Sequence, residues 1–181
     1  MSALQNVITE ATHFAVQSLS DVIGSELSFV LHDVEIENFT ASHFSAQKFG
    51  IVQLECSGLL NAEILLMFDI DGIFLILKKM LGAAADNEMI LECENEAMCE
   101  LGNVVMIRYL SEIADYLHTP LESTLPTYRV ELKDKFLKDV NSEKCLIASH
   151  VDLKLDDYTA EMKILFSVSR ESFENLKQTL H

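Results

Sequence analysis

The chain opens with apolar residues at helical spacing. Between Asn6 and Ile23 they recur at Val7, Ala11, Phe14, Ala15, Leu19 and Val22. Offsets of three and four residues keep such positions on one face of a helix. The pattern therefore predicts a first long helix.

Alternating apolar and polar residues then predict strands. Val52 to Cys56 alternates strictly, and Phe29 to Ile36 is rich in residues that favour strands. Gly58 and Asn61 mark a turn. Ala62 to Phe68 is expected to follow as the next strand.

The middle of the chain changes to helical signals. Asp69 to Gly72 interrupts the apolar run, and Ile73 to Leu81 is expected as a short helix capped by Gly82. A second long helix is predicted from Met89 to about Leu117, because its start is acidic and Pro120 lies just beyond its end.

The last part of the chain predicts three strands and a closing helix. The strands are Thr127 to Leu132, Cys145 to Leu155 and Ala160 to Val168, with Asp156 and Asp157 in a turn, and the helix is Ser172 to Leu180. Two long helices and about six strands, mostly adjacent in sequence, indicate an α+β fold in which helices cover one face of an antiparallel-rich sheet.

Composition indicates one folded domain over residues 1–181. The chain has 49% hydrophobic residues, 6 glycines and 2 prolines, and we see no low-complexity tract or linker. Its length is sufficient to bury a substantial core.

The charge limits the kinds of partner. A formal net charge of -16, from 13 basic and 29 acidic residues, argues against a nucleic-acid-binding surface, which needs clustered Lys and Arg. A partner with a basic face fits better, and the acidity taken alone is equally well explained by solubility.

Cysteine usage and hydropathy predict a cytoplasmic protein. The 4 cysteines form no C-x-x-C pair, and Met1 to Asn6 has no basic segment followed by an apolar core. The most apolar window, Ile64 to Leu81, contains four charged residues, too many for a membrane-spanning helix. We therefore expect no membrane insertion.

Metal and triad chemistry find no support in the sequence. The 6 histidines are scattered without metal-ligand spacing, and no G-x-S-x-G motif is present. We expect no metal site and no cofactor bound by the chain itself.

One polar constellation carries a specific hypothesis. Glu96, Glu100 and Asn103 follow an E-x3-E-x2-N pattern on one face of the second long helix, and Pro126 lies twenty-two intervening residues beyond Asn103. The chain has only 2 prolines, whereas a typical composition gives about 5%, so a chance match at this spacing is uncommon. On the spacing of Glu100 and Asn103 alone, an ordinary solvated helix face is the better interpretation; the proline and the order of elements favour a site.

These residues resemble the signature of the CheC/CheX/FliY family of chemotaxis phosphatases. The family pattern is Asp or Ser, three residues, Glu, two residues, Asn, twenty-two residues, Pro, and here Glu96 departs from its first position. The stretch from Val104 to Leu110 also lacks the small residues common in the family.

The resemblance implies a phosphatase acting on a phosphorylated CheY-like receiver domain in the cytoplasm. Asn103 would orient the hydrolytic water and Glu100 would dock on the receiver's lysine, with Glu96 adding charge at the rim. The Mg²⁺ would belong to the receiver. Met106, three residues after Asn103, is assigned either to partner binding or to the core.

The resemblance also implies an internal pseudo-repeat, in which a helix leads into three strands twice over. In the first half, Asn6, Glu10 and His13 repeat the spacing of the motif, but His13 replaces the amide and Ile36 stands where the proline should be. This single centre is more similar to CheX than to CheC or FliY, and CheX implies a homodimer. A non-catalytic module that binds a receiver or a flagellar-switch component is the alternative function.

Overall fold

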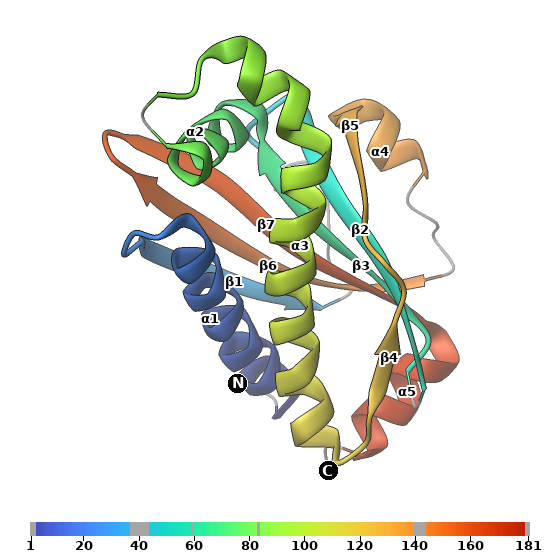
Figure 1. The fold of residues 1–181 in the computed structure, drawn as a ribbon. Helices are drawn as coiled ribbons and strands as arrows, with labels where there is room; N and C mark the ends of the chain where they lie inside the picture. Colours follow the sequence, from blue (N-terminus) through green and yellow to red (C-terminus); the bar gives the residue numbers. More distant parts are fainter. Residues whose placement is uncertain (1–2, 37–43, 59, 83, 140–143, 180–181) are drawn as a thin grey trace.

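The computed structural model describes residues 3–36, 44–58, 60–82, 84–139 and 144–179 as a layer of helices on one antiparallel sheet (Figure 1). In chain order the elements are α1 (Ala3–Ile23), β1 (Ser28–Ile36), β2 (Lys48–Gly58), β3 (Ala62–Asp69), α2 (Ile70–Leu81), α3 (Asn87–Leu117), β4 (Leu121–Ser123), β5 (Thr127–Leu132), α4 (Lys133–Asp139), β6 (Lys144–Leu155), β7 (Tyr158–Ser169) and α5 (Arg170–Thr179).

The sheet has the order β1-β6-β7-β3-β2, and β4 and β5 both pair with the outer edge of β2. All these pairs are antiparallel. Cys56 of β2 pairs with Ser123 of β4, and Gln53 of β2 pairs with Thr127 of β5. The three residue steps between the two positions on β2 therefore lie opposite four steps from β4 to β5. β4 and β5 are therefore one bent edge strand interrupted by a bulge of one extra residue. Because β4 is a separate strand, the sheet has seven strands instead of the expected six or so.

The expected pseudo-repeat is present as a two-fold arrangement around the centre of the sheet. β3 and β7 pair there, with Leu65 opposite Leu165; β2 and then β4 and β5 follow on one side, β6 and then β1 on the other. Each central strand ends in a residue that caps the next helix. The Gly72 amide donates to Asp69 Oδ1 at 2.7 Å before α2, and the Ser172 amide donates to Ser169 Oγ at 3.1 Å before α5.

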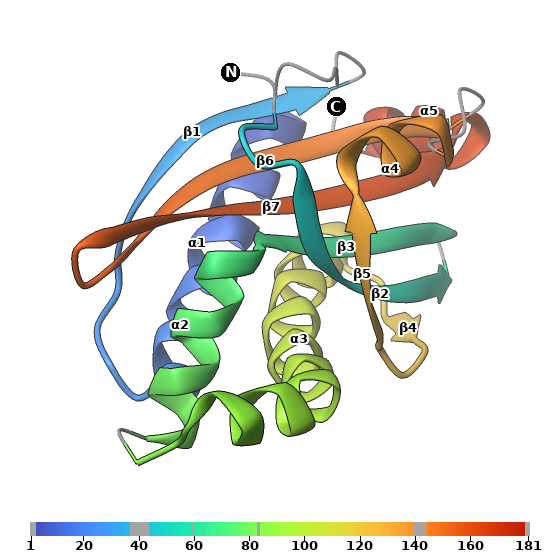
Figure 2. The same ribbon diagram turned by 90° about the horizontal axis from the view of Figure 1, so that it is seen from above.

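The helices α1, α2 and α3 cover one face of the sheet, as Figure 2 shows, and enclose the larger buried cluster of apolar side chains. Phe173 and Leu176 of α5 join the same cluster. A smaller cluster on the other face includes Phe49, Phe136 of α4 and Leu165. The α+β prediction is confirmed, but helices are not confined to one face.

The predicted elements are all found, with ends shifted by a few residues. Gly82 caps α2 with a positive φ of 91°, and His118 ends α3 in the left-handed region. The closing helix starts at Arg170 rather than Ser172, and Leu180, its expected last residue, lies outside the described residues. Sequence reasoning missed β4 and α4, because β4 is only 3 residues long and α4 buries one apolar side chain, Phe136.

A buried ion pair holds the chain against this second face. Glu161 of β7 accepts hydrogen bonds from Lys163 Nζ and, at 3.2 Å each, from the Ser45 and Ala46 amides. Lys163 is 2% exposed and its ammonium lies 5.0 Å from the centre of the Phe44 ring. Burial alone would raise the pKa of Glu161, but Lys163 and Ser45 outweigh it and hold that pKa below its ordinary value. Burial lowers the pKa of Lys163 more than Glu161 raises it.

The substitution Glu161→Gln is expected to destabilise the protein by about 3 kcal/mol at pH 7, because the buried Lys163 loses its ion-pair partner. A carboxylate with a depressed folded pKa contributes stability above its ordinary value of 4.5 and loses it as the pH falls through the folded pKa. The free energy of unfolding, measured with urea, should therefore be lower for Glu161→Gln than for the unaltered protein at pH 7, and this difference should shrink below pH 4.5.

Glu174→Gln is the control, since Glu174 forms an exposed pair with Lys177 at 2.7 Å and should contribute less than about 1 kcal/mol. Equal losses for the two variants would contradict a special role for the buried pair.

Candidate functional site

The helix that carries the motif lies unusually close to the sheet at one residue. A Cβ atom added to Gly102 would meet Val52 Cγ1 of β2 at 2.4 Å, a distance that real Cβ atoms do not reach. The missing side chain thus lets the α3 backbone rest directly on β2. Asn103 is the next residue, so its position above the sheet is set by this contact.

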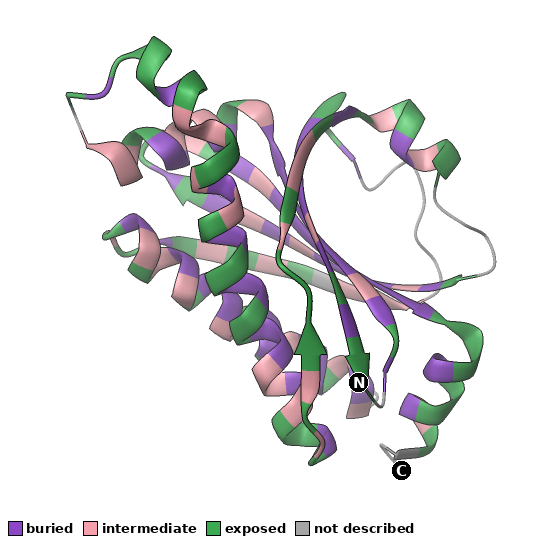
Figure 3. Ribbon diagram, turned by 45° about the vertical axis from the view of Figure 1, so that its right-hand side comes forward, coloured by how far each residue is buried: buried purple, intermediate pink, exposed green. Residues whose placement is uncertain are grey.

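Glu96, Glu100 and Asn103 lie on the outward face of α3, and each side chain is exposed. Figure 3 shows this face of α3 turned to solvent and the opposite face buried. Within the part of the chain that the structure describes, Glu100 and Asn103 make no ion pair or side-chain hydrogen bond. Their polar atoms are therefore available to a partner.

Met106 is not part of this face. It is fully buried in the larger core cluster, so its assignment to partner binding is wrong and its assignment to the core is right. At 100° per residue, a position three residues after Asn103 turns toward the sheet when Asn103 already lies at the edge of the exposed face.

Two apolar residues that the sequence reasoning passed over do lie at the surface next to Asn103. Val104 is 47% exposed and Ile107 is 39% exposed. Ile107 follows Asn103 by four residues, the offset that best preserves a helix face, and this was the signal available in the sequence.

Pro126 lies in the bulge between β4 and β5 and directly precedes β5. Its neighbour Thr124 is fixed to β2, since its amide donates to Glu55 O at 2.9 Å and its hydroxyl accepts from the Glu55 amide at 3.0 Å. Proline has no N–H to donate, so it fits where the ladder is interrupted. Pro126 therefore lies at the entry to β5.

The N-terminal half of α3 is fixed by Tyr128 of β5, whose hydroxyl donates to Glu94 Oε1 at 2.5 Å. Burial, and then the Glu94 carboxylate, raise the pKa of Tyr128, so it remains a donor at physiological pH. This bond and the Gly102 contact attach the motif helix to the two adjacent strands β5 and β2.

The equivalent positions on α1 carry a different chemistry. Asn6, Glu10 and His13 are exposed, and the His13 ring packs edge-on against Phe29 with centroids 5.1 Å apart. Thr12, which precedes His13 as Gly102 precedes Asn103, is buried and its hydroxyl lies 2.8 Å from that of Ser149 on β6.

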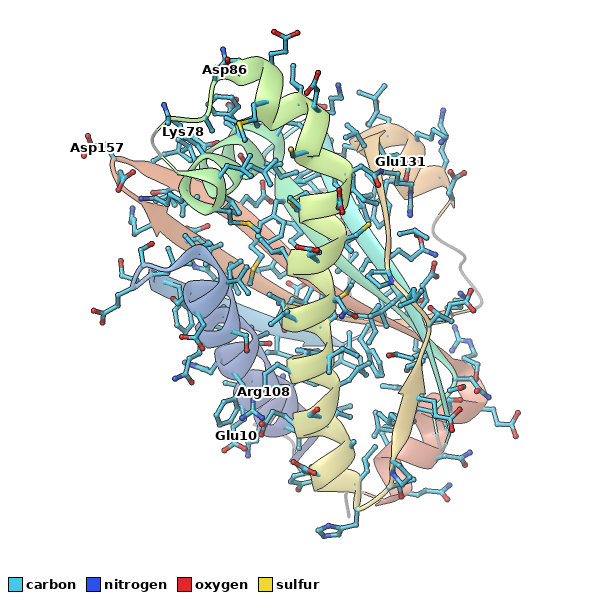
Figure 4. All side chains as sticks on the ribbon, in the orientation of Figure 1. Glu10, Lys78, Asp86, Arg108, Glu131 and Asp157 are labelled. Atoms are coloured by element: carbon cyan, nitrogen blue, oxygen red, sulfur yellow. The ribbon has the colours of Figure 1, made fainter. Side chains whose placement is uncertain are left out.

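α1 and α3 are joined by Arg108, which lies 4.6 Å from the centre of the Phe14 ring and pairs with Glu112 at 2.7 Å. Figure 4 shows Arg108 on the side of α3 that faces α1, near Glu10. Arg108 therefore lies off the face that carries Asn103.

The motif residues lie on the exposed side of α3. Cavities of about 370 and 410 Å³ lie elsewhere, and no α3 residue lines them. The first is lined by charged groups that already pair with one another, such as Glu131 with Arg129 and Lys135. An exposed, convex helix face suits a macromolecular partner better than a small ligand.

Among the residues that the structure describes, no three His, Cys, Asp or Glu side chains come together as a metal-binding group. None of the described helices is long and apolar enough to cross a membrane.

Comparison with known proteins finds structural neighbours only. No family model matches the chain, and no curated protein matches it in sequence. Among solved structures, FliY from Thermotoga maritima superposes with a TM-score of 0.71 at 16% identity, covering 94% of this chain and 89% of FliY.

Two complexes are also similar. CheX from Borrelia burgdorferi, solved with CheY, BeF₃ and Mg²⁺, gives a TM-score of 0.59 at 15% identity, covering 91% of this chain and 97% of that one. FliM from H. pylori, solved with FliG, gives 0.68 at 15% identity, covering 96% and 95%. The chain therefore has the fold expected from the resemblance in the sequence.

The substitution Gly102→Ala is expected to destabilise the protein by about 2 kcal/mol, because the added methyl overpacks the contact with Val52. This exceeds the gain of about 1 kcal/mol in helix propensity. In a Val52→Ala background the same substitution should cost less, since Val52 Cγ1 is removed. Urea unfolding of the four proteins in this double-mutant cycle tests the contact, and an identical loss in both backgrounds would contradict it.

Proposed function

We propose that the protein is a CheX-like member of the CheC/CheX/FliY family, a phosphatase that removes the phosphoryl group from a CheY-like receiver domain. The observation that carries this proposal is the exposed, unpaired Glu100 and Asn103 of the described structure, one turn apart on a helix held against the sheet at Gly102. The likeness to a CheX solved with CheY supports the choice of partner.

The proposed mechanism needs little chemistry from this chain. A receiver's aspartyl phosphate is a mixed anhydride held beside Mg²⁺ and a lysine that the receiver supplies. The Asn103 amide accepts a hydrogen bond from one water molecule and excludes other water positions, so that the water is aligned for attack. The chain itself requires no metal or cofactor.

Glu100 anchors the complex. Its carboxylate pairs with the receiver's lysine, which draws Asn103 into the phosphate pocket. Glu96, one turn earlier on the same exposed face, adds negative charge at the rim. Because both residues lie on a helix, their spacing is fixed before the partner arrives, and less ordering accompanies binding.

A binding module without catalysis is the second candidate, because FliM from H. pylori, solved with FliG, has the same fold. The two candidates agree on an exposed docking face and differ on Asn103. Both candidate functions are proposed for a protein of the cytoplasm.

The substitution Asn103→Ala is expected to reduce dephosphorylation of a CheY-like receiver from the same cell by at least a hundredfold, because the water loses its orientation. Binding to the receiver should survive. The measurement is the decay of the phosphorylated receiver with Mg²⁺, with catalytic amounts of each protein. Asn95→Ala, also exposed but two turns earlier on α3, is the matched control. Unchanged turnover with Asn103→Ala would rule out the proposed mechanism, and no acceleration by the unaltered protein would favour the binding module.

The substitution Glu100→Ala is expected to weaken docking, and so to raise the KM for the phosphorylated receiver by about tenfold or more. A KM equal to that of the unaltered protein would argue against an ion pair at Glu100.

We also propose a homodimer, as the CheX-like assignment implies. Sedimentation equilibrium should give about twice the chain mass of 20.4 kDa. A monomer throughout the micromolar range would count against the CheX-like assignment and leave the catalytic test unaffected.

A further inference from the structure

The bulge between β4 and β5 presents an apolar side chain to solvent. Leu125 is 84% exposed, more than any other large apolar side chain in the described ranges. Burial of a leucine side chain contributes free energy through the apolar area removed from water. Leu125 makes almost none of that contribution within this chain.

The segment that carries Leu125 is held on both sides. Thr124 makes two hydrogen bonds to the Glu55 backbone, Thr127 pairs with Gln53, and Pro126 has a fixed φ. The leucine therefore projects from a preformed backbone. A side chain presented in this way loses little conformational entropy on binding.

The bulge lies beside the motif helix. Gly102 rests on Val52, Val52 pairs with Tyr128, and Leu125 stands three residues before Tyr128. α3 contacts both β4 and β5, and Figures 1 and 3 show these strands running along α3. Ile107 follows Asn103 by four residues on α3, and Leu125 lies in the edge strand that contacts α3; both are exposed apolar residues.

The charges on α3 identify the chemistry of the occupant. Glu88, Glu92, Glu96 and Glu100 are exposed at successive intervals of four residues, and none forms an ion pair within the described structure. Like charges at this spacing destabilise a helix. A partner with a basic surface relieves this repulsion, whereas a second copy of this chain docked on the same face of α3, with its net charge of -16, increases it.

We propose that the β4–β5 bulge is a docking element of the motif face, and that Leu125 inserts into an apolar depression on a receiver domain whose surrounding surface is basic. This rests on the proposed function for the identity of the partner. Apolar insertion sets the lifetime of the complex, and the glutamates accelerate its formation.

The test compares Leu125→Ser with Val30→Ser. Val30 is 51% exposed on β1, at the opposite edge of the sheet, so the control removes a similar apolar group from a distant surface. Binding is measured by surface plasmon resonance to a CheY-like receiver from the same cell, activated with beryllofluoride and Mg²⁺, at low and high salt. Dephosphorylation kinetics are measured in parallel, and Leu125→Met serves as the conservative variant.

The expected result is an affinity at least tenfold lower for Leu125→Ser, mainly through faster dissociation, with Val30→Ser and Leu125→Met unchanged. In kinetics, Leu125→Ser should raise KM and leave kcat unaltered. Association of the unaltered protein should slow as salt increases.

Equal affinities for Leu125→Ser and Val30→Ser would overturn the docking role, even if the receiver is dephosphorylated normally. Association that does not depend on salt would overturn the basic surface. Binding that needs Leu125 without any dephosphorylation would support the docking element and reject the phosphatase. Failure of the unaltered protein to bind any receiver of the cell would overturn both proposals.

Discussion

The contact between Gly102 and Val52 is the constraint on which the rest of the candidate site depends. A helix normally stands away from a sheet by the depth of its side chains, and here one position has none. Because Val52 belongs to the strand that also pairs with β4 and β5, the same contact fixes the distance between the motif helix and the bulge. The exposed carboxylates, the Asn103 amide and the bulge that carries Leu125 are therefore held on elements that pack or pair with β2.

The two halves of the fold differ in how their long helices, α1 and α3, contact the sheet. On α1 the close approach to the sheet is polar, with Thr12 hydrogen-bonded to Ser149. On α3 it is apolar, with Gly102 against Val52. The residues that follow Thr12 and Gly102 differ as well. The His13 ring packs edge-on against Phe29, whereas Asn103 has no such neighbour among the described aromatic contacts. The repeat preserves the backbone while the chemistry of each outward face has diverged.

Much of this was available from the sequence, because periodicity is a local property. The long helices and the core strands follow from spacing and turn residues, and the shared face of Glu96, Glu100 and Asn103 follows from helix geometry alone. The error at Met106 had a different origin. Spacing defines which residues share a face, but only the orientation of the helix on the sheet decides which face is buried, and Met106 lies just past that boundary. The bulge at Leu125 could not be predicted, since it arises from the register between strands distant in sequence.

The arrangement of the sheet also has a consequence for how the chain folds. The first strand of each half pairs with a strand of the other half: β1 pairs with β6, and the bent strand β4–β5 pairs with β2. Each long helix likewise contacts a strand of the opposite half, α1 through Thr12 and Ser149 of β6, and α3 through Gly102 and Val52 of β2. Neither half can complete its own layer alone, so both halves must be synthesised before either is stable. The expected behaviour is a single cooperative unfolding transition that includes both halves.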